Sequence, residues 1–474
     1  MQYVSTRDVR TPPQVLAFED VLLGGLAGDG GLYVPAAWPR LAADDLHRLR
    51  GRSYAEIATA VMAPFVGESF DAPEFAALVD AAYARFGHQA VAPLKQLEPT
   101  LWLMELFHGP TLAFKDYALQ LVGPLFDHVL GKRRRRATII GATSGDTGSA
   151  AIEACRDRAA LDVFMLYPYR RISEVQRRQM TTVTSANVHA IAIDGSFDDC
   201  QDLVKAAFAD AAFRDEVSLS AVNSINWARI MAQIVYYVAA AVVLGAPDRP
   251  VGFAVPTGNF GNVYAAHAAR RMGVPIDELV IGTNRNDILV RFFNEGAMSI
   301  HSVEPSLSPS MDIQVSSNFE RLLFELKGRD GAAVADAMTQ FRRGGTLPAS
   351  AEEWRAARAL FTAHRVDDDE TRATIAATWR DAGELIDPHS AIAVAAAKAV
   401  RRDRRLAMVA LACAHPAKFP EAVEGATGVR PALPPGFADL MERPERLTLL
   451  ENDVQAVKEF VRVHARVVAG GGVA

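Results

Sequence analysis

Short apolar runs alternate with longer amphipathic stretches from about residue 100 onward. The clearest runs lie at 137–142 (ATIIGA), 161–168 (LDVFMLYP), 251–256 (VGFAVP), 279–284 (LVIGTN) and 406–414 (LAMVALACA). Short runs that are apolar throughout are typical of strands buried on both faces, and the helical stretches between them predict a parallel sheet covered by helices. We therefore expect an α/β fold that binds its ligands at the carboxyl ends of the strands.

The first 95 residues have a different pattern, with apolar positions at helical spacing. Ser53–Glu56 and Asp71–Glu74 each have the spacing of a capping box, and Pro73 suits the first turn of a helix. We expect a mostly helical N-terminal extension over residues 1–95.

An uncharged segment of eighteen residues, IMAQIVYYVAAAVVLGAP, separates Arg229 from Asp248. Eighteen apolar residues are about the minimum for spanning a bilayer. The segment is rich in alanine, contains Gln233 and two tyrosines, and stands alone in the sequence. We therefore interpret it as a buried helix of a soluble protein.

Composition narrows the class of protein. The chain is 50% hydrophobic and 22% charged, with a net charge of −6, so it is globular, with no general attraction for nucleic acid or anionic membranes. Its three cysteines form no CxxC pair, and its N-terminus lacks the apolar core of a signal peptide. We expect a cytoplasmic monomer or small homo-oligomer without a metal site.

Lysine is rare in this chain, which has eight lysines and forty-two arginines. Lys115 follows Leu112, Ala113 and Phe114, and a lysine in such an apolar setting loses proton affinity and becomes a nucleophile toward carbonyls. Lys418, within AHPAKF, is a second candidate. These patterns alone do not choose between the two lysines.

The first of two Gly-rich loops, GATSGDTG, spans Gly141–Gly148 between a predicted strand and a predicted helix. Glycines let backbone N–H groups approach an anion at a helix N-terminus. Thr143, Ser144 and Thr147 add hydroxyl groups. The anion can be a carboxylate or a phosphate, and the spacing is neither that of a P-loop nor that of GxGxxG.

The second loop, Pro256–Asn262 (PTGNFGN), also follows a strand and opens a helix, which suits a phosphate. A third candidate anion site is Asn223–Arg229 (NSINWAR), where amides, a hydroxyl and a guanidinium precede the uncharged helix. A reactive lysine beside two or three such sites points to pyridoxal phosphate and an anionic substrate.

With these motifs the chain resembles the threonine synthase family. The resemblance rests on YVSTR, DGGLYVP, HGPTLAFKD, TSGDTG, NSINWAR, GNFGN, SMDI with SNFER, and AHPAKF, between residue 3 and about residue 425. It implies the fold type II of pyridoxal enzymes, with two parallel-rich α/β domains. The catalytic region would span 96–425, with a smaller subdomain at about 125–225, and a C-terminal helical segment would span 426–474. The implied reaction converts O-phospho-L-homoserine and water to L-threonine and phosphate.

The resemblance also implies residue roles. Lys115 matches the Schiff-base lysine, and Asp146 lies where such enzymes approach the ring O3′ of the cofactor. Cys413 stands where the family usually has Thr, at the position that faces the pyridine nitrogen. The loop for the cofactor phosphate is Gly258, Asn259, Phe260, Gly261 and Asn262. The substrate carboxylate would meet Thr143, Ser144 and Thr147, and the substrate phosphate would meet Asn223, Ser224 and Arg229.

Three alternatives stay open at this stage. A threonine or serine dehydratase of the same fold is one, although its substrate has no phosphate for NSINWAR to bind. A pyridoxal-binding homologue that acts as a phospho-lyase or a regulator is another. The third is a nucleotide-binding oxidoreductase that uses GATSGDTG.

Overall fold

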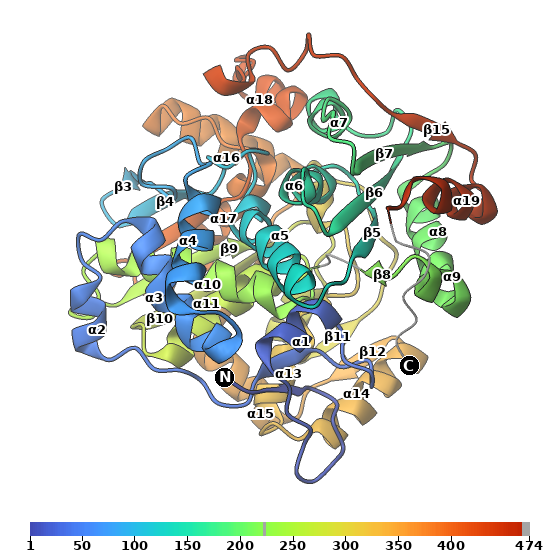
Figure 1. The fold of residues 1–474 in the computed structure, drawn as a ribbon. Coiled ribbons are helices and arrows are strands. Elements are labelled where there is room, and N and C mark those ends of the chain that lie inside the picture. Colours follow the sequence, from blue (N-terminus) through green and yellow to red (C-terminus); the bar gives the residue numbers. More distant parts are fainter. Residues whose placement is uncertain (221–223, 467–474) are drawn as a thin grey trace. The chain divides into compact units, whose positions relative to one another are not determined.

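The structure is a computed structural model that describes residues 1–220 and 224–466. The chain forms two compact units. The large unit consists of Met1–Ala118 and Ser224–Ala432, and the small unit consists of Leu119–Asn223 and Leu433–Ala474. Figure 1 shows the helices and strands of both.

The large unit is built on a six-stranded sheet. Its strand order is β13 (Phe361–Arg365), β10 (Ile276–Thr283), β9 (Val251–Pro256), β14 (Ala407–Ala412), β4 (Leu101–Glu105) and β3 (Leu94–Glu98). All neighbouring strands pair in parallel except β3, which is antiparallel to β4. The parallel sheet predicted from the apolar runs is therefore confirmed.

The core of the large unit forms where helices lie on this sheet. Helix α17 (Pro388–Val400) is rich in alanine and packs on β9, β10 and β14, where Ala254, Val280 and Ala410 join one apolar cluster. The approach is close, because a Cβ atom on Gly282 of β10 would lie 2.9 Å from the carbonyl oxygen of Ile392. Small side chains on both elements permit this distance.

The uncharged segment forms most of helix α10 (Trp227–Val243), in which every residue from Trp227 to Val242 is buried. It packs against α3 (Tyr54–Val66) and α11 (Gly261–Met272). The interpretation as a buried helix is confirmed. None of the described helices is long and apolar enough to span a bilayer.

The N-terminal residues pack as part of the large unit. Ser53 and Glu56 form the predicted capping box of α3, with the Ser53 hydroxyl accepting from the Glu56 N–H at 3.2 Å. The prediction of a capping box at Asp71 is wrong, because the Asp71 side chain makes no capping hydrogen bond. Pro73 does lie in the first turn of the helix, as predicted. The elements here are β1 (Tyr3–Ser5), α1 (Phe18–Gly24), β2 (Tyr33–Pro35), α2 (Ala43–Arg48), α3, η1 (Gly67–Ser69) and α4 (Ala72–Tyr83).

The remaining elements of the large unit are mostly helices that follow the sheet strands in sequence. They are α12 (Ile288–Glu295), β11 (Ala297–Ser299), η2 (Pro309–Met311), α13 (Phe319–Leu326), α14 (Gly331–Gly344), β12 (Thr346–Pro348), α15 (Ala351–Leu360), α16 (Asp368–Ala382), η3 (Pro416–Lys418) and α18 (Pro420–Thr427).

The small unit has a parallel sheet of its own, with the order β15 (Thr448–Leu450), β7 (Val188–Ile193), β6 (Leu161–Pro168), β5 (Ala137–Ala142) and β8 (Leu219–Ser220). Strand β15 comes from the C-terminal part of the chain and pairs with β7. Its other elements are α5 (Lys115–Lys132), which begins in the large unit, α6 (Asp146–Cys155), α7 (Glu174–Thr181), α8 (Phe197–Ala209), α9 (Ala211–Glu216), η4 (Pro435–Phe437) and α19 (Val454–His464).

His267 on α11 makes the stability of the fold depend on pH. Burial lowers the pKa of His267 to about 3, and neither ring nitrogen has a hydrogen-bond partner among the described residues. A histidine in the unfolded chain has a pKa of about 6.5. As pH falls below that value, the unfolded state binds a proton at His267 and the folded state does not. Stability is therefore lost progressively as pH falls from about 6.5 toward 3.

We expect His267→Phe to flatten this acid-side loss by about 2 to 3 kcal/mol between pH 7 and pH 4.5. Guanidinium unfolding midpoints at each pH measure the effect. The control is His88→Phe, at an exposed position, which should leave the pH profile of the wild type unchanged. A His267→Phe profile as steep as that of the wild type would contradict the prediction.

Candidate active site

The strand order of the large unit brings three distant motifs to one edge of the sheet. Strands β9, β14 and β4 are neighbours and run parallel, with Ala410 opposite Ala254 and Ala412 opposite Glu105. Their carboxyl ends lead into the segments that carry Gly258–Asn262, Cys413 and Lys115. Ligands of parallel sheets bind at such an edge.

The segment before Lys115 is held against the end of β14 by backbone hydrogen bonds. The Phe114 N–H donates to the Cys413 carbonyl at 2.8 Å, and the His415 N–H donates to the Leu112 carbonyl at 3.0 Å. Leu112 has a φ of 60°, a conformation that non-glycine residues adopt rarely and at some cost. This pairing places Cys413 beside the residue that precedes the candidate lysine.

Asp116 organises the turn that leads into Lys115. Its carboxylate accepts from both the N–H and the hydroxyl of Thr111 at 2.7 Å. Gly109 is required by this arrangement, since a Cβ atom there would lie 2.4 Å from the Cβ of Asp116. Lys115, the first residue of α5, is only 8% exposed, with its Nζ 5.2 Å from the centre of the Phe114 ring. Lys115 is therefore buried beside an aromatic ring.

The rival lysine has a structural task. Lys418 is fully buried, and its Nζ donates to the Thr111 carbonyl at 2.7 Å. Lys418 therefore braces the same turn that Asp116 organises. This contact supports Lys115 as the reactive lysine, whose role stays a prediction.

The loop Gly258–Gly261 forms the N-terminus of α11. Phe260 is its N-cap residue, with a φ of 64°. The carbonyl oxygens of Gly258 and Asn259 accept from the Ser316 hydroxyl at 2.7 Å and the Asn318 N–H at 3.0 Å. The first N–H groups of a helix have no partner within it, so the start of α11 offers several donors to one anion. The loop thus fits the phosphate group of a cofactor.

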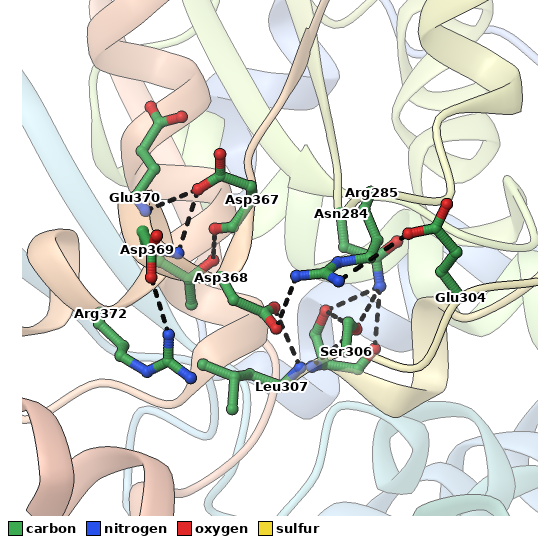
Figure 2. Close-up of polar contacts among 12 residues, drawn as sticks. Asn284, Arg285, Glu304, Ser306, Leu307, Asp367, Asp368, Asp369, Glu370 and Arg372 are labelled. Atoms are coloured by element: carbon green, nitrogen blue, oxygen red, sulfur yellow. Dashed lines mark hydrogen bonds and ion pairs between the residues drawn. The ribbon is translucent and has the colours of Figure 1, made fainter.

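A polar cluster beyond the end of β10 supports this loop. Asn284 Nδ2 donates to Ser306 at 2.8 Å, and Arg285 pairs with Asp368 at 2.9 Å (Figure 2). Asn284 Nδ2 also donates to Asp312 at 2.7 Å. The segment held in this way lies against the loop, since a Cβ atom on Gly258 would be 3.2 Å from the Cα of Met311. SMDI and SNFER are part of the family resemblance, but no structural role was predicted for them from the sequence.

Asn262 differs from the rest of its loop, because its side chain is directed toward Cys413. Its Oδ1 accepts from Tyr236 at 2.5 Å and from Tyr237 at 2.8 Å, while its Nδ2 lies 3.9 Å from the Cys413 Sγ. The two tyrosines lie on α10. Their contact with Asn262 was not predicted from the sequence, where they form part of an apolar helix.

Arg229 is a buried cation with an incomplete set of partners. Its side chain belongs to α10 and the residue is 3% exposed, yet Nε and Nη1 have no hydrogen-bond partner in the described part of the chain. Burial lowers its pKa to about 10. An unpaired buried guanidinium is costly, so the arrangement calls for an anionic ligand.

The rest of the NSINWAR motif frames Arg229. Asn226 is the N-cap of α10, and its Nδ2 also donates to the Leu22 carbonyl at 2.8 Å. The carbonyl of Ser224 accepts from Asn318 at 3.2 Å, and Arg321 donates to the Ile225 carbonyl at 2.6 Å. Asn223 lies outside the described residues. Asn318 and Arg321 were not predicted as functional residues. They were noted only as members of the SNFER motif.

The small unit holds the GATSGDTG loop between β5 and α6. The Thr143 hydroxyl accepts from the N–H groups of Gly145 and Gly148, both at 2.9 Å, and so closes the loop. Asp146 accepts from Gln176 at 2.9 Å, and Ser144 and Thr147 remain partly exposed. Their binding roles stay predictions.

Three family models match the chain: "Threonine synthase N terminus" over residues 2–83, "Pyridoxal-phosphate dependent enzyme" over 87–410, and "Threonine synthase, C-terminal" over 390–461. A threonine synthase of Pseudomonas aeruginosa is 55% identical over 465 residues, which cover 98% of each chain.

Two solved structures agree with this result. A pyridoxal-phosphate-bound threonine synthase from Brucella melitensis has 53% identity and a TM-score of 0.96, covering 98% of this chain and 100% of that one. Yeast threonine synthase has 36% identity and a TM-score of 0.92, with 98% of each chain covered. The chain therefore belongs to the threonine synthase family of pyridoxal-phosphate-dependent enzymes.

Proposed function

We propose that the chain converts O-phospho-L-homoserine and water to L-threonine and phosphate. The observation that carries this substrate choice is Arg229, a buried guanidinium with two nitrogens lacking partners among the described residues. Arg229 and Tyr236 are seven residues apart and share one face of α10, about 10 Å apart along its axis. Tyr236 contacts Asn262 at the start of α11, so Arg229 lies about two turns of α10 from a residue that contacts the candidate cofactor loop. A dehydratase substrate would offer no phosphate to this cation.

The residues present fit pyridoxal phosphate. Lys115 would hold its aldehyde, the N–H groups of Gly258–Asn262 its phosphate, and Cys413 its ring nitrogen. When bound, the cofactor supplies an electron sink for chemistry at the substrate Cα. Its O3′ is the group that we assign to Asp146.

The protein side chains then have separate tasks. The Lys115 amine removes the proton from the substrate Cα and moves a proton at Cβ. Arg229, with Ser224 and Asn223, neutralises the charge that develops on the departing phosphate. Ser144 and Thr147 donate to the substrate carboxylate, and Thr143, which closes the loop, keeps its own hydroxyl proton to donate.

We also propose a cytoplasmic location. Cys155, Cys200 and Cys413 are all free and buried, as expected in a reducing compartment.

We expect Lys115→Ala to lower turnover by at least about a thousandfold, because both cofactor attachment and proton transfer depend on the amine. Threonine and phosphate release measure turnover. Borohydride reduction of the wild type, followed by peptide mass spectrometry, should label Lys115. Lys398→Ala, at a half-exposed position paired with Glu98, serves as the control and should keep activity and labelling. Labelling of Lys418 instead would refute the assignment.

We expect Arg229→Met to lower kcat/KM for O-phospho-L-homoserine by about ten- to a hundredfold, the worth of a charge-assisted hydrogen bond. Inorganic phosphate should inhibit this variant more weakly than the wild type, while the absorbance of the bound cofactor stays the same. Because the change removes an unpaired buried charge, the substrate-free protein should also melt at a higher temperature.

Arg401→Met is the matched control, since the Arg401 side chain is also largely buried but contacts Thr100 and Glu98. It should leave kcat/KM and phosphate inhibition unchanged. Normal kinetics in Arg229→Met would remove the argument for the phosphate site.

A further inference from the structure

We propose that Asn262 is a positioning residue that makes the Cys413 thiol a hydrogen-bond donor toward the cofactor's ring nitrogen. The inference rests on the proposed function, which assigns Cys413 to the ring nitrogen. It goes beyond that assignment by stating which atom holds the proton, and which residues decide it.

The two tyrosines of α10 hold the Asn262 amide from one side. Burial raises the pKa of both Tyr236 and Tyr237, so both phenols keep their protons. Their hydroxyl groups meet the same atom, Asn262 Oδ1, at 2.5 and 2.8 Å. A carbonyl oxygen has two lone pairs and accepts from both phenols. The orientation of the Asn262 amide is therefore set from the α10 side.

The other end of the Asn262 amide carries its donor hydrogens. With Oδ1 committed to the tyrosines, the Nδ2 group is the part of Asn262 that lies toward Cys413, 3.9 Å from Sγ. An amide nitrogen can only donate, so the sulfur accepts. A thiol that accepts through sulfur offers its own proton as the donor for another group.

The backbone on either side of the Cys413 side chain is held by hydrogen bonds. The Cys413 N–H donates to the Ser390 hydroxyl at 3.1 Å, and the Cys413 carbonyl accepts from the Phe114 N–H at 2.8 Å. Ser390 is in turn bonded to the buried Asp387. Because the backbone of Cys413 is held on both sides, Sγ stays within reach of Asn262.

The thiol would leave the cofactor ring neutral. A pyridine nitrogen that accepts a hydrogen bond from a thiol stays unprotonated, whereas a carboxylate at the same position would stabilise a proton on the nitrogen. The contacts from Tyr236 and Tyr237 through Asn262 to Cys413 thus decide whether the ring nitrogen receives a hydrogen bond from the thiol.

The test uses enzyme reconstituted with pyridoxal phosphate that carries ¹⁵N in the ring, and reads the ¹⁵N chemical shift of the resting enzyme. Wild type should give the signal of an unprotonated, hydrogen-bonded nitrogen. Asn262→Asp is nearly isosteric and turns the donor facing Sγ into an acceptor, so the thiol donates to Asp and the ring loses its donor. The signal should then move downfield.

Asn259→Asp is the matched control. It makes the same change in the same loop, but Asn259 Oδ1 accepts from Ser317 at 3.2 Å, so the ring signal should keep the wild-type position. If Asn262→Asp fails to fold, the double variant Tyr236→Phe with Tyr237→Phe serves instead, because it frees the amide to turn and should also move the signal.

The outcomes separate this inference from the proposed function. Cys413→Asp should move the signal upfield to that of a protonated nitrogen; if it leaves the signal unchanged, Cys413 does not face the ring and the proposed placement fails. If Cys413→Asp acts as expected but the wild type is already protonated, or Asn262→Asp matches the wild type, the placement stands and the inference about Asn262 is overturned.

Discussion

The pairing of two short backbone segments is the constraint on which the rest of the site depends. Residues 112–114 lie antiparallel to 413–415 through the Phe114–Cys413 and Leu112–His415 hydrogen bonds. This pairing joins the start of α5 to the end of β14, and Lys418 and Asp116 brace the same turn from the two sides. The position of Lys115 is therefore fixed by main-chain bonds that no substitution of a neighbouring side chain removes directly.

A second principle of the site is that it leaves polar groups for a ligand to satisfy. Arg229 is buried at a cost, and the N-terminus of α11 presents N–H groups that the helix itself cannot bond. Anions in these positions would restore what folding leaves unpaired. Polar groups that lack partners among the described residues lower the stability of the free protein, and an anion bound to them would offset that cost.

Much of this site could be predicted, because its parts are local motifs. A Gly-rich segment between a strand and a helix has the same geometry wherever it occurs, and both such loops were found. Tyr236 and Tyr237 could not be recognised, since in sequence they are two aromatics in an apolar helix. Their hydroxyl groups donate to Asn262, which lies twenty-six and twenty-five residues further along the chain, and only the folded structure shows this contact. The capping box expected at Asp71 failed for a related reason: spacing permits such a bond without requiring it.

The sequence by itself determined the class of fold, the family and the candidate groups, because strand periodicity, glycine spacing and the scarcity of lysine are properties of short segments. It did not decide between Lys115 and Lys418 without the motif context. Only the tertiary structure decided that Lys418 donates to the Thr111 carbonyl and that Cys413 lies beside Phe114. It also decided that residues 433–466 join the small unit through β15. These facts depend on which strands become neighbours, and strand order is set by packing between segments hundreds of residues apart.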